Sequence, residues 1–68
     1  MAKARQVRKA LETAGWKLER VHGSHHICRR GSRTLIFAAH DSEEIGWRLL
    51  ARIATQAGLS LDHFRRLL

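Results

Sequence analysis

The sequence predicts an α+β fold of the order α-β-β-β-α-α, with helices packed on one face of a three-stranded antiparallel sheet. Residues 3–14 and residues 45–57 carry apolar side chains at the three- and four-residue spacing of a helix. Between them, residues 16–38 contain three short segments of strand character that are separated by glycine-containing turns. The chain of 68 residues has no proline and no repeat, so we expect a single domain over residues 1–68.

The first predicted helix covers residues 3–14. Its apolar positions fall on one face: Val7, Ala10, Leu11 and Ala14. Gly15 follows at the position that a C-terminal cap prefers.

Three short strands are predicted at residues 16–22, 25–30 and 33–38. Gly23 and Ser24 form the first connecting turn, and residues 30–33 form the second. Two short turns that join three consecutive strands indicate an antiparallel meander.

A second helix is predicted to start at Asp41, because Glu44 follows it at the spacing of a capping box. The helix would bury one apolar face and end at Gly58. That face consists of Ile45, Leu49, Leu50, Ile53, Ala54 and Ala57. Ser60 can then cap a short last helix over residues 61–67.

The charge of the chain is concentrated in its first half. Thirteen Lys and Arg residues stand against six Asp and Glu residues, which gives a formal net charge of +7. Residues 1–33 hold nine basic and two acidic residues, whereas residues 34–68 hold four of each. A field of this sign attracts phosphate backbones and acidic proteins, so we expect a nucleic acid or an acidic partner.

Cysteine usage and hydropathy predict a cytoplasmic protein. Cys28 is the only cysteine, which excludes a disulfide within the chain and fits a reducing compartment. No apolar run is long enough to span a membrane, and the basic start of the chain lacks the apolar core of a signal peptide.

Histidine is the natural candidate for chemistry, with five in the chain. His22, His25 and His26 cluster around the first predicted turn. Histidine titrates near neutral pH and can give or take a proton during phosphodiester cleavage. Further arginines on the same strands could hold a phosphate and stabilise the charge of the transition state: Arg20, Arg29, Arg30 and Arg33.

Competing interpretations of these residues are weaker. Adjacent strand residues point to opposite faces, so His25 and His26 are poorly placed to share a metal ion, and we expect no metal and no cofactor.

We expect Trp16 to lie in the core, although an exposed indole could stack on a base. Trp47 is expected to be partly exposed near the start of the second helix.

Several segments together resemble the HicA toxins of bacterial toxin–antitoxin pairs, nearly from end to end. These segments are residues 7–16, Gly23-Ser24-His25-His26-Ile27, His40 ahead of Glu44-Ile45, and Ala57-Gly58-Leu59-Ser60. The resemblance implies a fold like that of a double-stranded-RNA-binding domain. It also implies endoribonuclease cleavage of messenger RNA, with His25 as the catalytic residue and a HicB-type antitoxin as the partner. The family often has an aromatic at position 28, which implies that Cys28 points into the core, and that His25, Ile27 and Arg29 point to the open face.

The mechanism expected from this resemblance is metal-independent acid–base cleavage by His25, with His26, Lys17 or water as the second group. We expect the toxin alone to be monomeric and not to engage membranes. The residues expected to contact RNA are the turn residues Gly23 and Ser24 and the basic side chains of Lys3, Arg5, Arg8, Lys9, Arg29, Arg30 and Arg33.

Two other functions remain open from the sequence. The chain could bind RNA without cleaving it, or it could be a protein-interaction unit whose basic face serves an acidic partner. A His25→Ala variant distinguishes the first from an enzyme, and the salt dependence of RNA binding tests the second.

Overall fold

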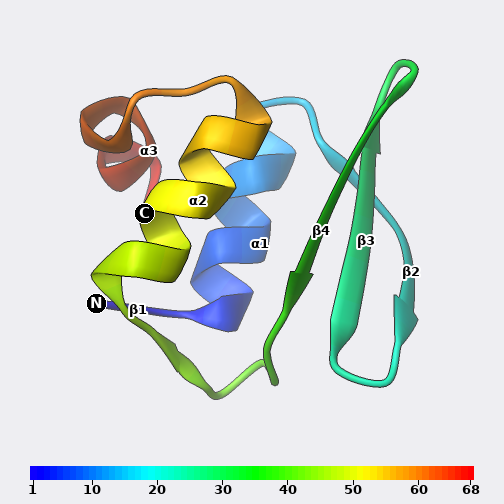
Figure 1. The fold of residues 1–68 in the computed structure, drawn as a ribbon, viewed down its shortest axis with the longest axis horizontal. Helices are drawn as coiled ribbons and strands as arrows, with labels where there is room; N and C mark the ends of the chain where they lie inside the picture. The colour runs from blue at the N-terminus through cyan, green and yellow to red at the C-terminus, as the bar shows by residue number, and fades with distance from the viewer.

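Three helices and a three-stranded antiparallel sheet form the architecture that the sequence predicts. The computed structural model describes residues 1–68. The elements in chain order are β1 (Ala2–Lys3), α1 (Ala4–Thr13), β2 (Lys17–His22), β3 (His25–Arg30), β4 (Arg33–Ala38), β5 (Glu44–Ile45), α2 (Trp47–Ala57) and α3 (Leu61–Leu67). Helices α1 and α2 lie between the sheet and α3, so one face of the sheet is covered and the other is left without a helix (Figure 1).

The sheet is the meander predicted from the two turns, in the order β2-β3-β4. Strands β3 and β4 coincide with the predicted ranges, and β2 starts one residue later. The two-residue period of a strand turns alternate side chains inward. The inward side chains of β3 and β4 are buried: His26, Cys28, Leu35 and Phe37.

The core lies between this inward face and the helices. Trp16, Leu11 and Ile53 are each almost fully buried, and Phe64 brings α3 onto the same cluster. Burying such a side chain stabilises the fold by about 1.5–3 kcal/mol. The buried positions of α1 are largely those predicted from its apolar spacing, and Trp16 lies in the core as expected.

The predicted start of the second helix is wrong. Asp41 lies in a turn rather than at a helix N-terminus, and α2 begins only at Trp47, with Gly46 as its N-cap. The amide of His40 donates to the Glu43 carboxylate at 3.3 Å, and the amide of Glu43 donates to the His40 carbonyl at 2.8 Å. The turn therefore pairs two residues that are three apart, as a capping box does, but they are His40 and Glu43 rather than the predicted Asp41 and Glu44. The end of the helix is as predicted, since Gly58 adopts a left-handed φ of 77°.

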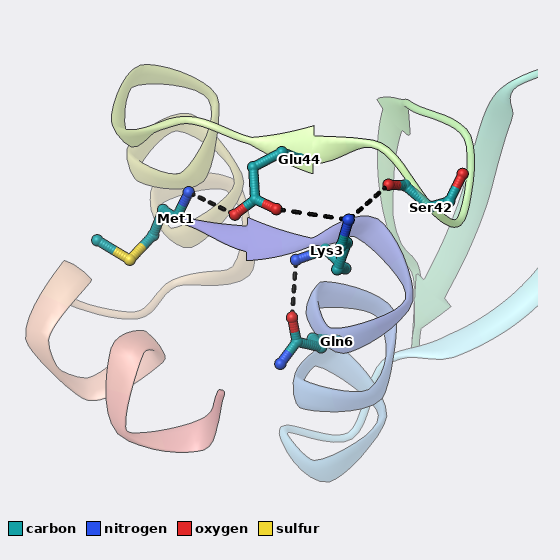
Figure 2. Close-up of polar contacts among 5 residues, drawn as sticks. All are labelled: Met1, Lys3, Gln6, Ser42 and Glu44. Carbon is teal, nitrogen blue, oxygen red and sulfur yellow. Dashed lines mark hydrogen bonds and ion pairs between the residues drawn. The ribbon is translucent and has the colours of Figure 1, made fainter.

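A short antiparallel pair of β1 and β5 was not predicted. It joins the start of the chain to the segment before α2, with Ala2 opposite Ile45 and Lys3 opposite Glu44. The Glu44 carboxylate lies 2.8 Å from the Met1 ammonium and 3.8 Å from the Lys3 Nζ (Figure 2). The Lys3 amide donates to the Gln6 side chain at 2.8 Å, which satisfies a donor just ahead of α1 (Figure 2).

Candidate functional site

The uncovered face of the sheet carries the outward side chains of β3. His25, Ile27 and Arg29 alternate with the buried residues of that strand, as the family resemblance implied for position 28 and its neighbours. Ile36 on β4 lies directly opposite Ile27 and is 47% exposed. An apolar spot next to a histidine suits contact with a base or a protein.

The turn between β2 and β3 places His25 at the first position of β3. Gly23 adopts a φ of 63°, a conformation that glycine accepts without steric strain, and space around it is open. The Ser24 carbonyl accepts a hydrogen bond of 2.9 Å from the amide of Ala39, just beyond β4. The turn is therefore fixed to the third strand, although its tip is exposed.

An open hollow surrounds His25 on this face. Its lining comes from all three strands and consists of Arg20, His22, His25, Ile27 and Ile36. Arg20 and His22 are the residues of the predicted histidine and arginine cluster that the structure places with His25. From the sequence, both were candidates for chemistry, but neither was among the residues expected to catalyse cleavage or to contact RNA.

The basic residues of the first helix form a second surface. Arg5, Arg8 and Lys9 line a hollow along the outer side of α1. The Arg8 guanidinium lies 3.3 Å from the Asp41 carboxylate. Asp41 lies in the segment after β4, just beyond Ala39, whose amide donates to the Ser24 carbonyl. The pair of Arg8 and Asp41 fixes α1 to the segment beside the hairpin turn. Lys3 also donates to the Ser42 carbonyl at 3.2 Å, so a phosphate would compete with the chain's own acceptors for this side chain (Figure 2).

The three remaining predicted RNA contacts lie at the other end of the strands. Arg29 is four residues from His25 along β3, which is about 13 Å. Its guanidinium binds the Glu19 carboxylate at 2.6 Å, and this hydrogen bond lowers the pKa of Glu19 and raises that of Arg29. Arg30 approaches Gly15, and Arg33 donates to the Gln56 carbonyl at 3.2 Å. The structure therefore does not place these arginines beside His25.

His26 lies on the opposite face of β3 from His25. It is only 3% exposed, and its ring stacks on Phe37 with a centroid distance of 4.7 Å. Its Nε2 lies 3.5 Å from the Asp41 carboxylate, whereas its Nδ1 is buried without a hydrogen-bond partner. This position removes His26 as the second proton-transfer group for a substrate at His25.

Cys28 is buried in the core, and burial raises the pKa of its thiol. We predict that the folded protein reacts with a thiol reagent such as dithionitrobenzoate far more slowly than the urea-unfolded chain, because the nucleophilic thiolate is both disfavoured and shielded. Equal reaction rates for the two states, followed by absorbance, would contradict this burial.

Two further features concern metals and membranes. Side chains of His, Cys, Asp and Glu form no group of three or more that could hold a metal ion. None of the helices combines the length and apolar character needed to cross a membrane.

Comparison with known protein families gives a match. A family model described as the HicA toxin of bacterial toxin–antitoxin matches residues 4–59, most of the chain. No curated protein and no solved structure matches.

Proposed function

Because the chain belongs to the HicA toxin family, it is a toxin of a toxin–antitoxin system, and we propose that it acts as an endoribonuclease on messenger RNA. His25 is the catalytic histidine of this proposal. The observation that carries it is the position of His25 on the uncovered face of the sheet, in an open hollow with Arg20. A side chain there can reach a phosphodiester, and a neighbouring guanidinium can stabilise the charge that develops on phosphorus.

RNA binding is proposed to extend from this hollow over the hairpin turn to α1. The tip formed by Gly23 and Ser24 leaves room for a backbone to approach, and Arg5 and Lys9 are exposed on the helix fixed beside it. Cytoplasmic messenger RNA is the substrate in this proposal, so the protein would act in that compartment. We also propose that the toxin alone is a monomer.

The family implies an antitoxin partner, and we infer that a HicB-type antitoxin covers the uncovered face of the sheet. Ile27 and Ile36 give this face an apolar centre beside His25. An acidic protein seated there would block the hollow and neutralise nearby positive charge at the same time.

The test is cleavage of a labelled messenger RNA in EDTA by the wild type and by His25→Ala. We expect the substitution to lower the cleavage rate by about 10²–10⁴-fold, because it removes a proton-transfer group, while RNA affinity is largely kept. A His63→Ala variant is the control, since His63 is exposed on α3, an element that contributes nothing to the hollow.

If the wild-type protein binds the RNA but leaves it intact, the nuclease proposal is wrong, and the result favours an RNA-binding module without catalytic activity. Equal cleavage by His25→Ala and the wild type would remove His25 from the mechanism.

A further inference from the structure

Cleavage of RNA through its 2′-hydroxyl needs two proton transfers. One group must take the proton of the attacking hydroxyl, and another must give a proton to the departing 5′-oxygen. The attacking and departing oxygens lie on opposite sides of the phosphorus in an in-line displacement, so the His25 imidazole alone cannot contact both. If the proposed ribonuclease function holds, a second residue must therefore carry out the other proton transfer.

His22 is the residue directly opposite His25 across the β2–β3 turn. Residues opposite each other in an antiparallel pair share a face, and their Cβ atoms lie about 4.5–5.5 Å apart. Both histidines are exposed, and both line the same open hollow. Two imidazoles held at this spacing by a two-residue turn can contact the two oxygens on opposite sides of one phosphorus atom.

The other candidates are placed less well. Lys17 pairs with Arg29 at the far end of the same two strands. His26 is buried on the opposite face. His40 follows β4 but does not line the hollow.

We propose that His22 and His25 form an acid–base couple. The neutral member of the pair takes the proton from the 2′-hydroxyl as that oxygen forms a bond to phosphorus. The bond from phosphorus to the 5′-oxygen breaks, and the protonated member gives its proton to that oxygen. The products are a 2′,3′-cyclic phosphate and a 5′-hydroxyl, and proton exchange with water restores the starting protonation of both rings.

The side chains around His22 and His25 suit the binding and cleavage of a phosphodiester. Apart from the two histidines, Arg20 of β2 is the only ionisable side chain that lines the hollow, and β3 and β4 contribute Ile27 and Ile36. No carboxylate lines the hollow to compete with a phosphate for the two imidazoles. Arg20 can bind a non-bridging phosphate oxygen as charge accumulates there.

The test compares His22→Ala, His25→Ala, His40→Ala and the control His63→Ala on one synthetic RNA, with cleavage followed across pH and RNA binding measured separately. We expect His22→Ala to lower kcat by about 10²–10⁴-fold with RNA affinity within a few-fold of wild type. The wild-type pH profile should be bell-shaped, since one histidine must be neutral and one protonated, and each single variant should lose one limb. Added imidazole should restore part of the rate of His22→Ala, an effect that a merely structural role would not give.

Four outcomes would overturn the couple. If His22→Ala cleaves like wild type while His25→Ala does not, the proposed nuclease stands and the couple fails. The couple also fails if His40→Ala, rather than His22→Ala, removes one limb of the profile. A parallel loss of RNA affinity and cleavage in His22→Ala would make His22 a binding residue. If the wild type does not cleave, the proposed function and the couple fail together.

Discussion

A Trp16→Ala variant is expected to lose about 3–5 kcal/mol of unfolding free energy. The Trp16 ring is buried at the junction of α1 and β2, with the Arg33 guanidinium 5.9 Å from its centre. Its indole nitrogen has no hydrogen-bond partner, so the loss comes from the removed apolar contacts and the cavity. A domain of 68 residues has a total stability of about 3–10 kcal/mol. The variant should therefore be close to unfolded, which urea denaturation followed by circular dichroism measures.

Trp47→Ala is the matched control, because it removes the same side chain from an exposed site. Trp47 is the first residue of α2 and is 47% exposed, as its position in the sequence suggested, with the Arg65 guanidinium 4.7 Å from the ring centre. An exposed contact of this kind contributes about 0.5–1 kcal/mol. Similar losses for the two variants would show that Trp16 does not anchor the core.

The sheet could be predicted from the sequence because local signals and burial agree there. Residues 25–30 lie between the turns that contain Gly23 and Gly31, and residues 33–38 follow the second of these turns. Both glycines adopt positive φ values in the structure. A strand of six residues with one buried face leaves little freedom of register, since a shift by one residue would expose Leu35 and Phe37.

The segment between β4 and α2 was predicted less well, for a physical reason. Ile45 is buried in β5, and a helix at this position would have buried it too, so apolar spacing could not separate the two. Strands of two residues are too short to show the alternation of apolar and polar side chains that identifies a strand in a sequence, and β1 and β5 are distant in sequence. Only tertiary structure brings Ala2 and Ile45 together.

The candidate site could be predicted in part. His25 follows from the resemblance, and its outward orientation follows from alternation along β3. The pairing of His22 with His25 carried a signal that was not used, because a two-residue hairpin turn places its flanking residues opposite each other. The positions of Arg29, Arg30 and Arg33 far from His25 also follow from strand length, whereas the contact between Arg8 and Asp41 needs the full fold.

RNA affinity of the His25→Ala protein, which leaves the RNA intact, is expected to fall steeply with salt. Each phosphate contact on a single strand adds about −0.7 to the slope of log affinity against log salt. Eight cationic side chains are candidates, the seven expected from the sequence and Arg20 of the hollow, but Lys3, Arg8 and Arg29 lie 3.8, 3.3 and 2.6 Å from carboxylate oxygens. Eight contacts would give a slope of about −5.6, and the five others alone about −3.5. We expect a value between these limits, because exposed ion pairs are weak enough for phosphate to compete.

Paired substitutions then locate the RNA on the surface. Removing Arg5 and Lys9 together should make the slope shallower by about 1.4 and weaken binding about 25-fold at 0.1 M salt, since each lost contact accounts for about fivefold. Arg48→Ala with Arg52→Ala removes the same charge from exposed positions of α2 and is the control. Equal losses from the two pairs would mean that only net charge matters. A slope shallower than about −1 for the His25→Ala protein without further substitutions would instead favour an acidic protein as the ligand of the basic half, because few phosphates would then be neutralised.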